Sequence, residues 1–226
     1  DRYPDVLIAV GPECLDEETR EEIFVKIFNS HKVKGLHIDF WSCRNLMRFS
    51  LTQRTAELLL NEVEHSDLLD ANLINALKLS EFADFSVLSP ERRTHAEDIF
   101  VSLLNYEGAK IGDYYYLSRP LMNHSILSVD LLERALTHVA DTTNCYLIQM
   151  ICSMCVSLGI ADEYAQWVLS KAQYVRNYDE DGATHVISNN ELLEFMRALR
   201  QPKNILSTVC FLLPNKRHRH DSYFEK

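Results

Sequence analysis

The sequence lacks the long apolar runs that membrane-spanning helices require. A spanning helix needs about 18 or more consecutive apolar residues, and the longest run here, around residues 146–151, is far shorter. The first residues, DRYPDVLIAV, also lack the basic start and small-residue cleavage site of a secretory signal. We therefore expect no membrane partner, and the missing initial methionine indicates a piece of a longer protein.

The sequence has no excess of positive charge. Its 23 lysine and arginine residues are outnumbered by 33 aspartate and glutamate residues, which gives a formal net charge of −10. An acidic body repels a polyanion over a Debye length of about 8 to 10 Å, so general nucleic-acid binding is not expected. The basic cluster at residues 216–220 lies in the tail, where a short charge run is usually solvated.

Glycine is scarce, with six residues in 226. The sequence contains no glycine-rich motif of the kind found at catalytic or nucleotide-binding sites. A Rossmann turn needs several free backbone amides near the phosphates, whereas Gly11 is followed directly by Pro12. His95 and His124 lack the serine elbow and partner order of nucleophilic catalysis. We therefore predict a protein that is not an enzyme and that has no cofactor.

The six cysteines are not expected to form a disulfide framework, because they are scattered through a chain large enough to bury an apolar core. We expect free, buried thiols in a reducing compartment, the cytoplasm or the nucleus. Cys152 and Cys155 form a C-x-x-C pair, so a redox enzyme is the alternative function, but their apolar neighbours favour core packing. A zinc site that adds Cys145 and His138 lacks the paired ligand spacing, so no metal is predicted.

What the sequence does contain is a recurring leucine followed by a capping residue. The five pairs are Leu15-Asp16, Leu51-Thr52, Leu88-Ser89, Leu127-Ser128 and Leu158-Gly159, spaced by 36, 37, 39 and 31 residues. Each pair follows a short apolar run that favours a β-strand and precedes apolar residues at helical spacing. Such a period is typical of a repeat array in which stacked units share one core.

We therefore predict an α/β fold, an open array of strand–helix repeats with a parallel, leucine-rich-repeat-like sheet, over residues 1–171. Residues 172–213 are expected to close it with a hairpin, a helix and a strand, before a basic and polar tail at 214–226. The predicted strands are residues 4–10, 34–41, 77–79, 114–117, 145–150, 172–178, 183–188 and 205–213. An all-α helical repeat, in which these runs are short helices, is the alternative.

Two segments carry a resemblance to a known family. Residues 36–46, LHIDFWSCRNL, resemble a leucine-rich-repeat strand and turn. Residues 33–46, VKGLHIDFWSCRNL, and 174–188, YVRNYDEDGATHVIS, resemble the divergent repeat domains that follow the F-box in nematode F-box proteins. The resemblance implies a domain that holds a target protein for a ubiquitin ligase, whose other subunits bind through a region missing from this chain.

The strand positions that face away from the helices form the predicted partner surface. By strand alternation, the outward side chains are His37, Asp39, Trp41, Lys78, Tyr114, Tyr116 and Gln149. Tryptophan and tyrosine supply much of the binding energy of protein interfaces. We therefore predict a non-enzymatic protein–protein recognition module with another protein as its partner. The alternative is that these tyrosines only cover the sheet or meet a missing domain.

Overall fold

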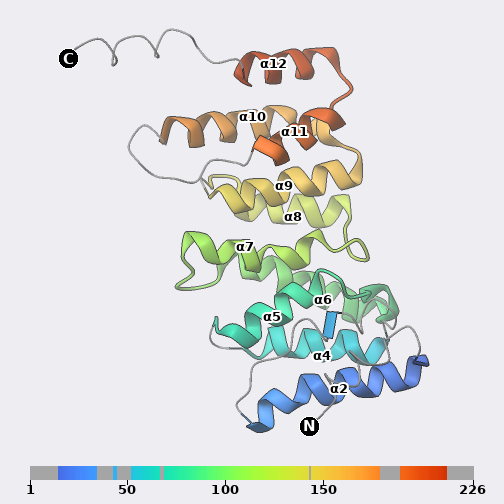
Figure 1. Ribbon diagram of the computed structural model, residues 1–226. Helices are drawn as coiled ribbons and strands as arrows, with labels where there is room; N and C mark the ends of the chain where they lie inside the picture. Colours follow the sequence, from blue (N-terminus) through green and yellow to red (C-terminus); the bar gives the residue numbers. More distant parts are fainter. Residues whose placement is uncertain are drawn as a thin grey trace, which may run out of the picture. The chain divides into compact units, whose positions relative to one another are not determined.

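The computed structural model (Figure 1) describes residues 15–34, 43–44, 52–66, 69–142, 144–178 and 189–212. All regular secondary structure within these ranges is helical, and none of them contains a strand. The chain forms two compact units, Asp1–Asp141 and Thr142–Lys226. No helix in the described ranges is both long and apolar enough to cross a membrane.

The first unit stacks its helices in two layers. Its longer helices are α2 (Glu17–Lys34), α4 (Gln53–Glu64), α5 (Ala71–Ser80), α6 (Pro90–Ser102) and α8 (Val129–Val139). The shorter ones are η2 (Phe85–Val87), η3 (Leu103–Asn105), η4 (Ile111–Asp113), α7 (Tyr114–Leu117) and η5 (Arg119–Met122). In the first layer α4 packs on α2 and α6, and α6 packs on α8. In the second layer α5 packs on α7 and η5.

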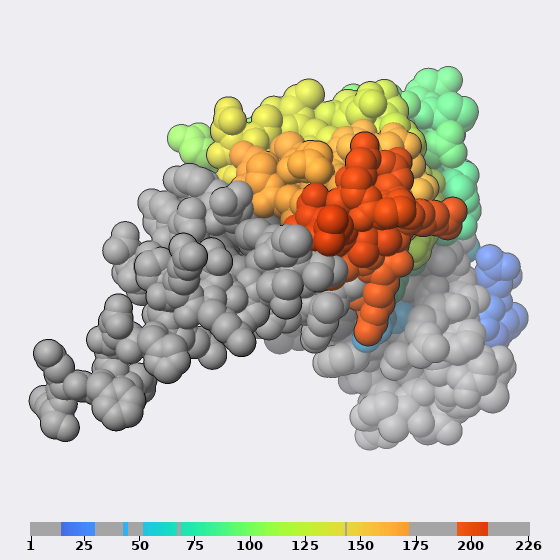
Figure 2. All heavy atoms as spheres, turned by 90° about the horizontal axis from the view of Figure 1, so that it is seen from above, coloured from blue at the N-terminus to red at the C-terminus, as the bar shows by residue number. Residues whose placement is uncertain are grey.

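The second unit contains α9 (Cys145–Leu158), α10 (Ala161–Tyr178), α11 (Asn189–Ala198) and α12 (Pro202–Leu212). Helix α9 packs on α10 and α11, and α10 packs on α12. The Asp162 carboxylate on α10 accepts hydrogen bonds from the backbone N–H groups of Arg200 and Gln201 and from the amide of Asn204. These bonds fix the start of α12. Asn204 is buried there, while the other described side chains of residues 202–207 are exposed, and this red segment lies at the surface in Figure 2.

The leucine-and-cap pairs mark helix ends. The side-chain oxygens of Asp16, Thr52, Ser89 and Ser128 each accept a hydrogen bond from the backbone N–H three residues later, at 2.8 to 3.3 Å. They are therefore the N-caps of α2, α4, α6 and α8. Gly159 does the opposite, because it ends α9 in the left-handed conformation, with φ of 72°.

The predicted α/β fold is wrong. Residues 77–79, 114–117 and 145–150 lie in α5, α7 and α9, and residues 172–178 and 205–212 continue α10 and α12. Short apolar runs do not distinguish a buried strand from a buried helix. Helix α9 illustrates this, because it buries side chains around most of its circumference. The predicted strand at 34–41 begins at the last residue of α2, and its other residues lie outside the described ones, as do the predicted strands at 4–10 and 183–188.

The apolar stripes predicted for the helices do form the core. Helix α2 buries Ile23, Phe24, Ile27 and Phe28, and α4 buries Ala56, Leu59, Leu60 and Val63. The rings of Phe24 and Phe28 stack with their centroids 5.6 Å apart. The helices predicted from apolar spacing are therefore correct where this spacing extends over several helical turns.

A buried asparagine joins the end of α5 to the segment after α7. Asn123 is 2% exposed, and its amide nitrogen donates to the backbone carbonyls of Ser80 at 2.6 Å and Ala83 at 2.7 Å. Its amide oxygen accepts from the N–H and hydroxyl of Ser125, and that hydroxyl accepts from the N–H of Phe85. The Asn123 and Ser125 side chains thereby connect the end of α5, the turn after it and the start of η2 to the segment that follows η5.

We expect Asn123→Ala to lower the free energy of unfolding by about 2 to 4 kcal/mol. The substitution leaves two backbone carbonyls, those of Ser80 and Ala83, without their hydrogen-bond donor, and each buried acceptor without a donor costs about 1 to 3 kcal/mol. Urea unfolding followed by circular dichroism measures this. Asn105→Ala is the control, because its amide is exposed and is hydrogen-bonded to the exposed ring of His138. Equal effects of the two substitutions would contradict a structural role for the buried amide.

Arginine–glutamate pairs connect successive helices of the first layer. The pairs are Arg54–Glu21 at 3.5 Å, Arg92–Glu57 at 2.9 Å and Arg134–Glu97 at 3.2 Å. Their sequence separations are 33, 35 and 37 residues. Partly exposed pairs of this kind contribute about 0.2 to 1 kcal/mol each. They therefore align neighbouring helices more than they stabilise them.

Two carboxyls between these helices have pKa shifts of opposite sign. A hydrogen bond from His95, at 2.9 Å, lowers the pKa of Glu64 from its ordinary value of 4.5. Burial raises the pKa of Glu97, and the nearby Arg134 guanidinium only partly offsets this effect. The stabilising effect of Glu64 is therefore present above about pH 4.5 and lost as the pH falls through its lowered pKa, whereas ionised Glu97 destabilises as the pH rises.

We expect Glu64→Gln to destabilise the protein near about pH 6 and to have a smaller effect as the pH falls through the lowered pKa of the wild-type carboxyl. Glu97→Gln removes the cost of a buried charge at neutral pH, so it should be least harmful there and should become relatively more harmful as the pH falls and the wild-type carboxyl takes up a proton. Urea unfolding across this pH range tests both variants. The same pH trend in both would contradict the assigned shifts.

Candidate functional site

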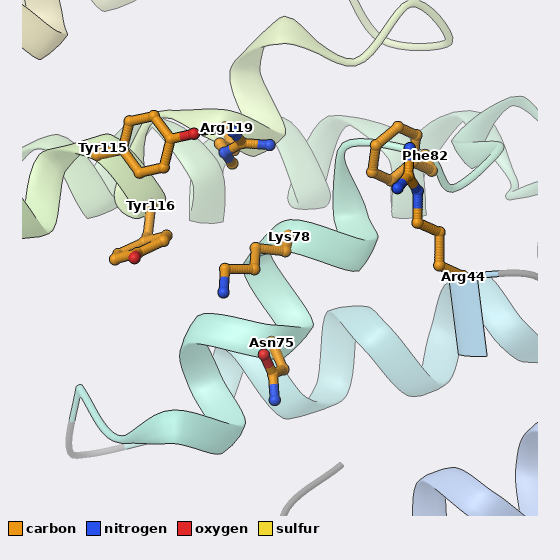
Figure 3. A pocket seen from close by; sticks show the side chains of 7 residues that line it. All are labelled: Arg44, Asn75, Lys78, Phe82, Tyr115, Tyr116 and Arg119. Carbon is orange, nitrogen blue, oxygen red and sulfur yellow. Dashed lines mark hydrogen bonds between the residues drawn. The ribbon is translucent and has the colours of Figure 1, made fainter. Parts of the chain in front are cut away.

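The candidate site is a pocket in the second layer of the first unit (Figure 3). Its volume is about 510 Å³. The lining residues are Arg44, Asn75, Lys78, Phe82, Tyr115, Tyr116 and Arg119. They come from α5 and the turn after it, from α7, from the start of η5 and from residues 43–44. The pocket therefore depends on how α5 lies against α7 and η5.

Each cation of the pocket lies over an aromatic ring. The distances to the ring centroids are 4.6 Å for Arg44 over Phe82, 4.9 Å for Lys78 over Tyr116 and 4.6 Å for Arg119 over Tyr115. A cation within about 6 Å of a ring centroid is attracted to the ring face. Such a contact positions the cation without neutralising its charge, because the ring carries no full negative charge.

The Arg119 guanidinium is also fixed by hydrogen bonds. One terminal nitrogen pairs with the Glu81 carboxylate, and the other donates to the Tyr115 hydroxyl. About a fifth to a quarter of the Arg119 and Glu81 side chains is exposed, so water screens this ion pair only in part. The pair adds a second link between the end of α5 and η5, close to the Asn123 amide. These contacts together fix the orientation of the Arg119 side chain.

The charge of the pocket is opposite to that of the whole chain. The seven described residues that line it include three cations and no carboxylate, although Glu81 pairs with Arg119 from outside this lining, and the chain as a whole has a net charge of −10. A local cluster of one sign with low-dielectric walls concentrates the counter-charged ligand. The pocket is therefore suited to an anionic group.

Sequence reasoning found two of the lining residues, Lys78 and Tyr116, and placed them in strands instead of helices. Tyr114 shares α7 with Tyr116 but does not line the pocket, because residues two apart point to different sides of a helix. Gln149 lies on α9, in the other unit. His37, Asp39 and Trp41 lie outside the described residues.

The remaining lining residues were missed, although helical spacing could have indicated some of them. Asn75, Lys78 and Phe82 follow one another at intervals of three and four residues, and Tyr115 and Arg119 are four apart. Because these segments were assigned to strands, neither of the two helical spacings was recognised. Arg44 carries no such signal, because it comes from a separate segment.

The C-x-x-C pair packs in the core of the second unit. Cys152 and Cys155 are 1% and 0% exposed, and burial raises the pKa of Cys155 to about 12. The four cysteines whose side chains are described, Cys43, Cys145, Cys152 and Cys155, are free and buried. Among the described residues, no group of three or more metal-ligating side chains could hold an ion. Thiolate chemistry needs a lowered pKa, and Cys155 has the opposite shift.

We expect Cys155 to resist iodoacetamide in the folded protein. At about pH 8, a thiol with a pKa of about 12 is ionised in roughly one molecule in ten thousand, and the side chain is inaccessible. Mass spectrometry should find this cysteine unlabelled after treatment that fully labels the urea-unfolded chain. Rapid labelling of the folded chain would contradict the burial and would favour a reactive thiol.

No protein-family model, curated protein or solved structure matches this chain. The resemblance to F-box-associated repeat domains accordingly stays a prediction.

Proposed function

We propose that the chain is a non-enzymatic protein-recognition module and that the pocket between α5 and α7 belongs to its partner-binding surface. The observation that carries the proposal is the set of three cation–aromatic pairs in one pocket. Arginine and tyrosine are enriched among the residues that dominate interface energies. Tyr115 and Phe82 are 43% and 36% exposed, so large rings are available for contact.

The same lining argues against catalysis at this pocket. The seven residues include no carboxylate, histidine or thiol, which are the groups most often used as general bases or nucleophiles. The pocket is also open at the surface of a stack of helices, and such stacks offer extended surfaces to partner proteins. A protein segment therefore fits the site better than a substrate that must be shielded from water.

The ubiquitin-ligase role is a finer proposal and has separate support. It comes from the resemblance of residues 33–46 and 174–188 to F-box-associated domains. Most of these residues lie outside the part of the chain that the structure describes. Its test is the identity of the proteins that the chain captures. Ubiquitin-ligase subunits or their targets are the expected classes.

We expect Lys78→Met to reduce partner capture about tenfold, the loss that corresponds to one charge-assisted contact. The chain would be used as bait in a lysate of its native cells, and quantitative mass spectrometry would compare it with the variant. A matched control is Lys171→Met, because Lys171 also lies over an aromatic ring, that of Trp167, in the second unit.

The melting temperature of both variants should stay close to that of the wild type, because neither lysine is in the core. Proteins captured equally by wild type and by Lys78→Met would show that the pocket is not the recognition surface. Loss of capture with the Lys171→Met control alone would place the surface in the second unit.

A further inference from the structure

The segment after η5 contains an acceptor sequence for N-linked glycans. Asn123, His124 and Ser125 form the pattern Asn-X-Ser, in which X is not proline. In secreted proteins this pattern is glycosylated, and the modified asparagine lies in a surface loop. Here Asn123 is 2% exposed and is buried in the first unit. The fold therefore makes the acceptor side chain inaccessible.

Both hydrogens of the Asn123 amide are used within the protein. The nitrogen donates to the backbone carbonyls of Ser80 at 2.6 Å and Ala83 at 2.7 Å. In glycosylation this nitrogen forms a bond to C1 of an oligosaccharide carried on a lipid pyrophosphate, the lipid pyrophosphate leaves, and one amide proton is released to solvent. One of the two carbonyls would then lose its donor, and the sugar would have to fit into the short space between that carbonyl and the nitrogen.

The hydroxyl of the acceptor sequence is engaged as well. Ser125 donates it to the Asn123 amide oxygen at 2.6 Å, and it accepts from the N–H of Phe85 at 2.9 Å. The Asn123 carbonyl accepts from the N–H groups of Ile126 and Leu127, so the segment is a closed turn. A transferase requires the amide and the hydroxyl on an extended, accessible segment. Only the unfolded chain presents them in this way.

We infer that glycosylation of Asn123 and folding of the first unit exclude each other, and that the chain therefore folds outside the secretory pathway, in the cytoplasm or the nucleus. A chain that enters the secretory pathway meets the transferase during translocation, before it folds, so this acceptor would be modified first. The four described cysteines are thiols and not disulfides, as expected in the same reducing compartments. The inference is independent of the proposed function.

His124→Pro removes the acceptor sequence and suits the fold. Proline after the asparagine blocks modification. His124 is exposed and is the second residue of a turn that the Ile126 N–H closes on the Asn123 carbonyl, and proline is favoured at this position. Asn123 has φ of −70° and ψ of 124°, the extended conformation of a residue before proline. The variant is therefore a matched control.

The test compares the full chain made in the cytoplasm of eukaryotic cells with the same chain directed into the endoplasmic reticulum by an added signal peptide. We expect the redirected wild type to carry a glycan on Asn123, detected by mass spectrometry, and to lose the protease resistance of its first unit. Redirected His124→Pro should stay unmodified and resistant, and both chains should melt alike when made in the cytoplasm. A redirected wild type that is unmodified, or that is glycosylated at Asn123 and still resistant, would overturn the inference.

Refolding separates the effect of the glycan from that of the compartment. The glycosylated chain and the cytoplasmic chain are both unfolded in urea with a reductant and then diluted. We expect the cytoplasmic chain to regain the protease resistance of its first unit and the glycosylated chain to fail. Equal refolding of the two would overturn the inference whatever the variant does, and so would a glycan on Asn123 of the folded protein purified from its native cells.

Discussion

One buried amide joins the two parts of the first unit that carry the pocket. Asn123 is almost inaccessible to water, so the hydrogen bonds of its amide are made within the protein. Its nitrogen donates to the end of α5 and to the turn before η2, about 40 residues earlier in the chain, and its oxygen accepts from Ser125. Lys78 lies on α5 shortly before these carbonyls, and Tyr115 and Arg119 lie on α7 and η5 shortly before Asn123. A contact in the core therefore sets the geometry of a pocket at the surface.

Two kinds of contact hold the stacked helices, and they have different roles. Buried apolar stripes supply most of the free energy, because each large side chain removed from water contributes about 1.5 to 3 kcal/mol. The arginine–glutamate pairs between first-layer helices are weaker and partly screened. Their regular recurrence matches the spacing of the N-caps, so the same alignment is repeated along the layer.

The sequence was informative where the physics is local. Capping by Thr52 or Ser89 involves a side chain and an N–H three residues away, and a stripe such as that of α4 repeats within one helix. In runs as short as residues 77–79 the sequence does not distinguish a strand from a helix, because three positions are too few to show either period. The contacts of Asn123 join residues 40 and 43 positions apart, and no local pattern predicts them. The pocket was found only in part for the same reason.

The use of aromatic rings to hold the cations leaves the net charge of the lining in place. A carboxylate partner offsets the charge of a cation, as Glu81 does for Arg119, whereas a ring attracts the cation without carrying a full charge of its own. Like charges in one pocket repel one another. The aromatic contacts therefore orient cations whose mutual repulsion has to be offset by contacts elsewhere in the unit.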